Sequence, residues 1–447
     1  MGFWSREEQA QDALSIAERF FLHQLFLVVP IFFIGFLFPS LVHGHGFANY
    51  AQGAKATAMG GAFTAIGDDP TANYYNPAGI AFLEGTRVML GSTLFTSKKG
   101  YFESAGVSNM PGVTSEEKFN VKSETNILPF IHFTHATPEG FGLGFSGYSM
   151  WGQKNSWPDY WEGRFTPGGL KSEISSYRGQ AVMAYAPDER VSFSAGVFYQ
   201  WIDVRMSQKL WLPMLMSEFD YSMDGSDDGL GWIAGILFKP HENLSLGVSY
   251  RSRVSHELDA MNIKIKPEIP AMGIDNARGT MRFTTPAVLK MGTALTWEKF
   301  TVAFDVYWTE WSVQDKIKVK FNQPFLGVAE QTQDKKWNNT FTYGLGLEYA
   351  ATDYLSLRAG YIYDPSPVPS ETLDPMVFSG DSQLFCFGIG LEKGRFGADL
   401  SYSKIISKDR RFDNRSGDLP NPGGQRVVGD FKNASLDIFI ASLVYRF

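Results

Sequence analysis

Apolar and polar side chains alternate along many segments of the chain, beginning near residue 86. In 191–201, VSFSAGVFYQW, the odd-numbered residues are mostly apolar and the even-numbered residues are mostly small or polar. The segments 243–253, 340–350 and 354–363 repeat this alternation. Because successive side chains of a strand point to opposite faces of a sheet, this period of two predicts β-strands with one apolar and one polar face.

The length of these segments separates two kinds of β protein. Strands of soluble domains average about 5–6 residues, and their apolar faces meet in a core. Here the alternation continues for about ten or more residues with aromatic residues often at the ends, which is typical of transmembrane strands. The pattern therefore predicts an all-β fold, a transmembrane antiparallel β-barrel whose apolar face contacts lipid.

The connections between the predicted strands alternate between short and long. Short turns such as 137–140 and 350–354 are separated by long connections such as 150–174 and 365–382. Outer-membrane barrels have short periplasmic turns and long extracellular loops, whereas a sandwich has no reason to keep this order. Fourteen strands are predicted, and they start near residues 86, 117, 141, 175, 190, 229, 243, 280, 299, 337, 354, 383, 395 and 433.

The N-terminal residues 1–44 are predicted to be a signal peptide. The run Leu25–Gly44 is apolar and ends in a small residue, as secretory signals do. A membrane-anchoring helix is the alternative, and Pro30 and Pro39 argue against it. The acidic stretch that precedes the apolar run is unusual for a signal, so the start codon is expected further downstream.

Residues 45–85 do not alternate and are rich in Gly, Ala and turn-forming residues. A barrel of this size encloses a lumen that wall side chains cannot fill, so a segment placed before the first strand is expected to form a plug, or hatch, inside it. Asp68, Asp69 and Asn76 suit the turns and caps that such a segment needs. The predicted organisation is a hatch over 45–85 and a barrel with long extracellular loops over 86–447.

Composition and charge narrow the function. Aromatic residues make up 15% of the chain and charged residues 19%, and the net charge of −7 argues against a nucleic-acid partner. The single cysteine, Cys386, excludes an internal disulfide. No catalytic motif is present, and His132 and His135 point to opposite faces of one strand. We therefore expect neither an enzyme nor a metal or other cofactor.

The chain ends in SLDIFIASLVYRF, an alternating strand that stops on Phe447. Phe439, Ala441, Leu443 and Tyr445 share its apolar face. This ending resembles the signal that directs outer-membrane barrels to the barrel assembly machinery. We expect the bacterial outer membrane as the location, with its lipid and this machinery as partners.

Several short motifs carry a family resemblance that spans essentially the whole mature chain. The segments HGF (45–47), AMGGAF (58–63) and DDPTANYYNPAGIA (68–81) resemble the mature start and hatch of the FadL-type transporters of long-chain fatty acids and hydrophobic compounds. That family includes members that take up toluene and other aromatic hydrocarbons. Further similar words are WEGRF (161–165), SYRS (249–252), WTEWS (308–312) and DPSPVP (364–369).

The resemblance implies passive uptake of a hydrophobic small molecule through the outer membrane. The molecule is captured among the extracellular loops, passes to a pocket in the lumen, and is released sideways through the wall after the hatch moves. The hatch motif comprises Asn76, Pro77, Ala78 and Gly79, and Asp68 and Asp69 are expected either to form an ion-paired latch or to cap turns. Gly142, Gly144 and Gly147 of the third strand are expected to weaken strand pairing where the wall opens, or to leave space for the plug.

A fatty acid carboxylate in the lumen needs a cation. The resemblance places a ligand-binding arginine near Arg205 and Lys209, with Gln208 in the directly aligned position, and a lysine at Lys318. Arg251 and Arg358 are also expected to face inward, although charged lumen residues are ordinary in barrels. Exposed loop aromatics are expected to capture the cargo, and these are Trp157, Tyr160, Trp161 and Phe165.

Three functions remain open from the sequence. The first is uptake of long-chain fatty acids, and the second is uptake of aromatic or alkane hydrocarbons by the same mechanism. The third, from another class, is a loop-mediated adhesin or phage receptor without transport.

Overall fold

The computed structural model describes residues 46–49, 51–98, 100–107, 118–123, 125–378, 380–414 and 426–447. The predicted signal peptide, residues 1–44, lies outside the described residues. Among the described helices, none combines the length and the apolar character needed to cross a membrane.

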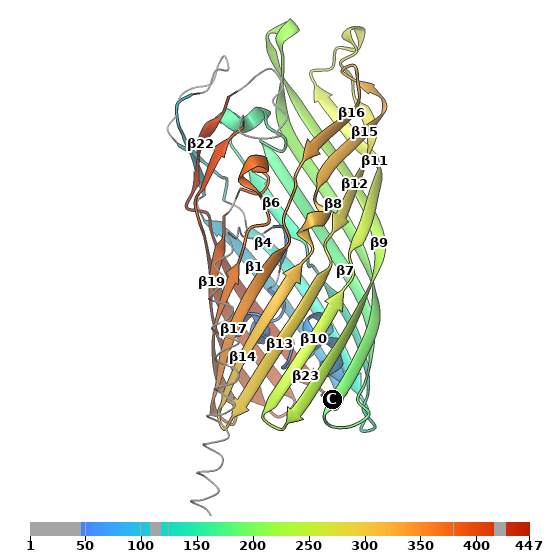
Figure 1. Ribbon diagram of the computed structural model, residues 1–447, viewed down its shortest axis with the longest axis vertical. Helices are drawn as coiled ribbons and strands as arrows, with labels where there is room; N and C mark the ends of the chain where they lie inside the picture. Colours follow the sequence, from blue (N-terminus) through green and yellow to red (C-terminus); the bar gives the residue numbers. More distant parts are fainter. Residues whose placement is uncertain are drawn as a thin grey trace, which may run out of the picture. The chain divides into compact units, whose positions relative to one another are not determined.

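Fourteen antiparallel strands form a closed barrel (Figure 1), which confirms the predicted fold class. Closure follows from β1, which pairs with β4 on one side and with the last strand, β23, on the other. The strands are, in order around the wall, β1 (Gly85–Lys98), β4 (Thr125–Ala136), β5 (Phe141–Tyr148), β7 (Lys171–Tyr185), β8 (Val191–Leu212), β9 (Ser217–His241), β10 (Leu244–Arg251), β13 (Val288–Trp297), β14 (Phe300–Thr309), β17 (Thr340–Thr352), β18 (Leu355–Asp364), β19 (Ser382–Lys393), β20 (Phe396–Ser407) and β23 (Ser435–Arg446).

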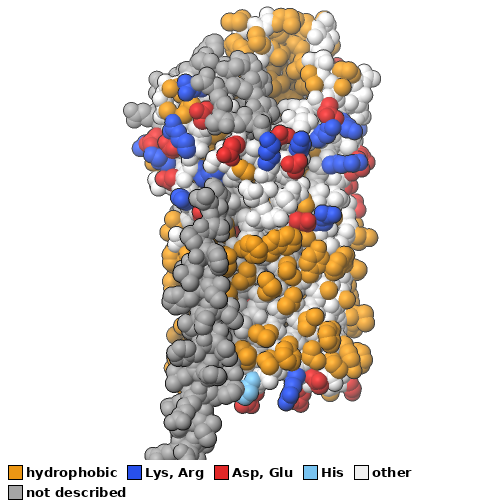
Figure 2. All heavy atoms as spheres, in the orientation of Figure 1, with side chains coloured by type: hydrophobic (Ala, Val, Ile, Leu, Met, Phe, Trp, Pro, Cys, Tyr) orange, Lys and Arg blue, Asp and Glu red, His pale blue; other side chains and the backbone are white. Residues whose placement is uncertain are grey.

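The apolar faces of the strands point out of the barrel, as the alternation predicted. Val197 and Leu443 are 61% and 64% exposed, whereas Ser192 and Gln200 of the same wall are fully buried. Figure 2 shows the result as an apolar band over the lower barrel with a belt of charged side chains above it. A surface of this kind is stable only where lipid is the solvent.

Above the band, several hairpins extend the wall beyond the barrel (Figure 1). Strand β9 continues upward and pairs with β11, β11 pairs with β12, and β12 pairs with β15. A separate four-stranded sheet lies among the loops. The extra strands are β2 (Tyr101–Ser104), β3 (Lys118–Asn120), β6 (Gly152–Ser156), β11 (Val254–Lys266), β12 (Ala277–Thr285), β15 (Lys316–Phe325), β16 (Val328–Asp334), β21 (Arg410–Asp413) and β22 (Val428–Lys432), and the short loop helices are η2 (Glu162–Phe165), η3 (Pro213–Leu215), η4 (Pro270–Met272), η5 (Trp311–Val313) and η6 (Ser370–Thr372).

Three predicted strand starts were wrong. The strand predicted near residue 117 begins at Thr125, the strand predicted near 229 begins at Ser217, and the strand predicted near 280 begins at Val288. Residues 118–120 and 277–285 are strands as well, but β3 belongs to the separate four-stranded sheet and β12 to the hairpins that extend the wall above the barrel. Strands of a loop hairpin alternate like strands of the wall, so periodicity alone does not distinguish them.

Residues 46–83, here called the N-terminal segment, contain the helices α2 (Ala54–Ala58), α3 (Ala72–Tyr75) and η1 (Pro77–Phe82). Strands all around the wall bind it. The hydroxyl of Ser192 on β8 donates to the carbonyl of Ala78 at 2.7 Å, and the amide of Ala54 donates to the hydroxyl of Ser442 on β23 at 2.9 Å. The segment is therefore enclosed by the barrel.

Small residues allow this close approach. Gly60 has φ +63°, and a Cβ built on Gly360 of the wall would lie 2.1 Å from its nitrogen. Glycine on both sides is thus required where the segment's backbone touches β18.

Candidate functional site

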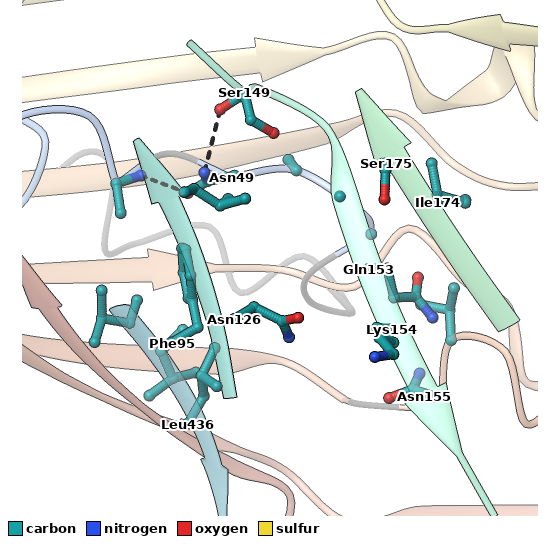
Figure 3. A pocket seen from close by; sticks show the side chains of 18 of the residues that line it. Asn49, Phe95, Asn126, Ser149, Gln153, Lys154, Asn155, Ile174, Ser175 and Leu436 are labelled. Carbon is teal, nitrogen blue, oxygen red and sulfur yellow. Dashed lines mark hydrogen bonds between the residues drawn. The ribbon is translucent and has the colours of Figure 1, made fainter. Parts of the chain in front are cut away.

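A cavity of about 290 Å³ lies between the N-terminal segment and the wall. Figure 3 shows it with Asn49 and Ser149 at one side and Asn126, Gln153 and Asn155 at the other. Its inner lining is largely apolar and includes Phe95, Ile362, Val377, Phe378, Leu384, Ile405, Leu436 and Ile438.

The cavity reaches the wall at an interruption in the strand pairing. The second half of β4, Ile131–Ala136, pairs with β5, whereas the first half, Thr125–Phe130, pairs only with β1 among the described strands. Among the described strands, β6, which follows β5, pairs with β7 alone, and the carbonyl of Ser156 at its end accepts from the amide of Lys122, which precedes β4, at 2.8 Å. A gap therefore separates the start of β4 from β6, and polar residues of both strands line it.

The N-terminal segment holds the chain away from β4 at this gap. The amide of Asn49 donates to the carbonyl of Met150 at 2.7 Å, and the amide of Gly152 donates to the carbonyl of Phe47 at 2.9 Å. The side chain of Asn49 also donates to the carbonyl of Ser149 at 3.2 Å, as Figure 3 shows. Residues 149–152 thus pair with the segment in place of β4, which satisfies backbone groups that the gap would leave open.

The three glycines of β5 lie just before this gap. Cβ atoms at Gly142 and Gly144 would collide with Ile80 and Asn73 of the N-terminal segment, while Gly147 lies beside Ile131. Gly142 and Gly144 therefore make room for the segment. Their part in a lateral opening stays a prediction, because β5 is still paired with β4 and β7 at all three glycines.

The hatch motif forms a compact buried turn. The side-chain amide of Asn76 donates to the carbonyls of Thr64 and Ile236, both at 2.9 Å, and its oxygen accepts from the amide of Ala78 at 3.2 Å. Pro77 opens helix η1, and Gly79 packs against Gly67 where a Cβ has no space. The motif joins two turns of the segment to β9.

The two aspartates of the motif have different partners. Asp68 pairs with Lys55 of the same segment at 2.7 Å, and Lys55 also lies 3.7 Å from Glu348 of the wall. Asp69 accepts from the amide and hydroxyl of Thr71 at 2.7 and 2.5 Å, which is a turn cap. The ion pair of Asp68 with Lys55 is consistent with the latch that was expected, and the hydrogen bonds of Asp69 with Thr71 are those of a turn cap.

Arg358 completes the ionic contacts of this region. It is buried on the inner face of β18 and pairs with Glu348 at 2.5 Å and with Asp399 at 2.6 Å. Its charge is therefore balanced by the wall itself, and it is expected to hold strands together.

Three of the predicted head-group cations lie outside the lumen. Arg205 and Lys209 share the outward face of β8 and pair with Asp203 at 2.8 Å and Asp220 at 2.5 Å. Lys318 belongs to β15 above the barrel, where its side chain is 49% exposed and pairs with Glu330 at 2.7 Å. The prediction that they face the lumen was wrong. The alternation of inward and outward side chains continues above the apolar band, and there the outward positions carry charged residues.

Inside the lumen, Arg251 is buried and donates to the carbonyl of Tyr74 at 2.8 Å. Two further cations that were not predicted from the sequence, Arg178 and Lys290, are also buried. Arg178 donates to Gln200 at 2.7 Å, and the ammonium of Lys290 lies over tyrosine rings. The sequence VLKMGTALTW could have predicted this position of Lys290, because Lys290 lies two residues before Gly292 and therefore on the same face of the strand.

The loop aromatics are mostly buried, which corrects the expectation of an exposed capture surface. Trp157 stacks on Trp161 with ring centroids 4.4 Å apart, and Phe165 is also buried. Tyr160 alone of the four is exposed, at 52%. The tryptophans pack against Phe378 and Phe102 of neighbouring loops, because a loop long enough to fold back buries its own large side chains.

Within the described residues, no group of three or more His, Cys, Asp or Glu side chains is arranged to hold a metal ion. Several buried ionic groups pair with each other or contact the N-terminal segment, whereas Arg178 and Arg410 are held by neutral groups of the wall and loops. What the arrangement offers is an apolar cavity, a polar gap in the wall and an enclosed segment that borders both.

Comparisons with known proteins agree with this geometry. A family model described as "Outer membrane protein transport protein (OMPP1/FadL/TodX)" matches residues 43–447. The chain is 23% identical to a long-chain fatty acid transport protein of Escherichia coli O6:H1, over 71% of this chain and 77% of that one. It is 21% identical to a 47 kDa outer membrane protein of Pasteurella multocida, over 86% and 89% of the two chains.

Solved structures show the same fold. A Pseudomonas aeruginosa FadL homologue superposes with a TM-score of 0.73 at 20% identity, covering 91% of this chain and 100% of that one. The Pseudomonas putida toluene transporter TodX gives 0.66 at 16% identity, covering 91% and 99%.

Proposed function

Because the chain belongs to the outer membrane protein transport family that includes FadL and TodX, we propose that its cargo is a long-chain fatty acid. The family membership and the closed barrel make it an outer-membrane transporter of hydrophobic compounds and not an enzyme by family. The identity of the cargo and the route of release are the parts that we propose.

The observation that carries this proposal is the mixed lining of the cavity. Apolar side chains such as Leu384, Ile405 and Ile438 line it together with the polar side chains of Asn126, Gln153 and Lys154 from β4 and β6. An amphipathic molecule matches this lining, and we propose that its carboxylate lies against the polar residues and its alkyl chain against the apolar ones. A carboxylate that leaves water needs hydrogen-bond donors and a cation. Asn126 and Gln153 carry such donors, and Lys154, which also interacts electrostatically with Glu173 of β7, carries the positive charge.

We propose that release occurs sideways through the gap between β4 and β6. An apolar molecule that leaves there enters the membrane without crossing a wet lumen. The N-terminal segment is proposed to act as the hatch, since residues 47–49 pair with Met150 and Gly152 at the edge of the gap. A shift of the segment would change the shape of the opening. It would also change the contacts of Gly142 and Gly144 with Ile80 and Asn73 of the segment.

Capture from outside is proposed to begin among the extracellular loops. Tyr160 is the exposed aromatic of the WEGRF loop, and the buried Trp157, Trp161 and Phe165 are expected to hold that loop in shape. The cargo would then pass inward to the cavity.

A neutral aromatic or alkane hydrocarbon is the second candidate, and one observation favours it. The lumen cations Arg178, Arg251 and Arg358 are engaged by protein groups, so the cavity offers a carboxylate little beyond its polar residues from β4 and β6. Uptake of labelled oleate and of toluene, in cells with and without the protein, separates the candidates. Faster entry of oleate supports the proposal, faster entry of toluene alone supports the second candidate, and entry of neither supports a receptor role.

We further propose that Phe447 contacts the barrel assembly machinery. Its side chain is exposed at the end of β23, and its amide donates to the carbonyl of Thr86 at 3.0 Å. Deletion of Phe447 should lower the amount of protein inserted in the outer membrane. Insertion at the normal level would reject this role.

A further inference from the structure

Lys290 is a buried cation whose surroundings are divided between the wall and the N-terminal segment. It lies on the inner face of β13 and is 2% exposed. Its ammonium lies 4.1 Å from the ring centroid of Tyr74, 4.5 Å from that of Tyr75 and 4.4 Å from that of Tyr307. Two of these rings belong to the segment and the third to β14, so the cage is complete only while the segment is in place.

The ammonium makes no hydrogen bond to another described residue. Asp305 of β14 uses one carboxylate oxygen to accept from the amides of Phe63 and Thr64 at 3.1 and 2.9 Å, and its other oxygen is buried without a hydrogen bond. Arg251, a second buried cation, lies against the ring of Tyr74 at 4.9 Å. Lys290 is therefore surrounded by aromatic faces, a like charge and an acid that the segment engages through one of its two oxygens.

Two opposite effects act on this side chain. The tyrosine faces attract the ammonium, and this attraction is largest where water is excluded. Burial of an ammonium without hydrogen bonds is unfavourable, and the penalty exceeds the gain from a few aromatic faces. An unbranched apolar side chain such as Met would fill the same space and pack well on the rings. A buried group that lowers stability in this way calls for a functional reason.

We propose that Lys290 is a positioning residue that keeps the closed arrangement of the N-terminal segment from becoming too stable. When the segment moves, Tyr74 and Tyr75 leave the cage and the ammonium gains hydration from the lumen. The free-energy difference between the closed and the shifted arrangement is thereby reduced. This inference rests on the proposed hatch role of the segment and names one residue that sets its equilibrium.

A stabilising role of Lys290 predicts the opposite effect of its removal on the segment. If Lys290 only fastens the segment through its tyrosines, its removal should loosen the segment. The chain supplies a matched control in Lys239, whose ammonium lies 3.8 Å from the ring centroid of Phe82, also in the segment, but on a side chain that is only partly buried. Lys239→Met removes a cation–aromatic contact without removing a fully buried charge.

Hydrogen–deuterium exchange of the purified full-length protein in detergent tests the proposal. We expect Lys290→Met to slow exchange of the Phe63 and Thr64 amides by about tenfold, which corresponds to about 1.4 kcal/mol in favour of the closed arrangement. Lys290→Gln should slow it less, and Lys239→Met should leave it unchanged or faster. Because this readout needs no cargo, it is independent of which molecule the protein transports.

Uptake by cells supplies the second readout. Lys290→Met should take up the cargo more slowly than the wild-type protein while its thermal unfolding temperature rises. Faster or unchanged exchange in both Lys290 variants would overturn the proposal, as would slower exchange with undiminished uptake. If the wild-type protein took up no fatty acid but exchange still slowed in Lys290→Met, the cargo assignment would fail and the role of Lys290 would stand.

Discussion

The side-chain amide of Asn76 donates a hydrogen bond to the main-chain carbonyl of Ile236, 2.9 Å away, and so ties the N-terminal segment to β9. The same amide binds Thr64 of the segment, and the neighbouring Gly235 leaves no room for a Cβ, which would lie 2.2 Å from the Asn76 oxygen. One buried side chain thus fixes a turn of the segment and its place against the wall.

Asn76→Ala should therefore destabilise the segment. Removal of the amide leaves buried carbonyls without donors, which costs about 1–3 kcal/mol. Differential scanning calorimetry of the purified protein should show a lower unfolding temperature, and the Phe63 amide should exchange faster. Ser192→Ala, which removes one hydrogen bond to Ala78, is the milder control. An unaltered unfolding temperature in Asn76→Ala would contradict the anchoring role.

Lys318→Ala should leave fatty acid affinity unchanged. The side chain lies on the outer face of β15, half exposed and paired with Glu330, so it cannot face a ligand in the lumen. Titration with a fluorescent fatty acid measures the affinity directly. Lys154→Met, in the lining of the cavity, is the comparison that should weaken binding. Weaker binding in Lys318→Ala alone would reverse the assignment.

Trp161→Ala should loosen the extracellular loops without unfolding the barrel. Its ring is fully buried and stacks on Trp157, and truncation of such a side chain costs about 3–5 kcal/mol. Limited proteolysis on intact cells should cleave the loops of this variant faster. Tyr160→Ala, next in sequence but exposed, should be cleaved at the wild-type rate. Equal cleavage of both variants would show that the stack does not hold the loops.

The stability of these loops should fall as the pH rises. Burial raises the pKa of the Glu162 carboxyl, although a hydrogen bond from Ser104 acts in the other direction. The folded loop then binds this proton more tightly than the unfolded chain does. The contribution to stability is complete below the ordinary pKa of glutamate and is lost as the pH rises through the raised value. Proteolysis should accelerate over this interval in the wild-type protein and much less in Glu162→Gln; equal acceleration would assign the effect to other groups.

The wall could be predicted from the sequence because its physics is periodic. Phe193 and Tyr199 showed which face of β8 meets lipid, and the same parity places Arg205 and Lys209 outside. The alternation alone would have placed these two side chains on the outer face, whereas the family resemblance had suggested that they bind ligand in the lumen. Alternation likewise identifies Arg251 as an inward residue.

The loops and the gap could not be predicted in the same way. No periodicity indicates that Trp157 and Trp161 stack, because their burial depends on contacts with Phe378 and other residues far away in the sequence. The gap arises where residues 149–152 pair with the N-terminal segment, a contact across about a hundred residues that no local pattern encodes.

The central claim is that the cargo leaves through the gap between β4 and β6. Asn126 lines the gap, whereas the next residue, Ile127, points away from it and is 65% exposed on the outer face. Uptake of labelled oleate should fall in Asn126→Trp to the level of cells that lack the protein, and it should stay at the wild-type rate in Ile127→Trp. Wild-type uptake by a correctly inserted Asn126→Trp barrel would contradict the claim.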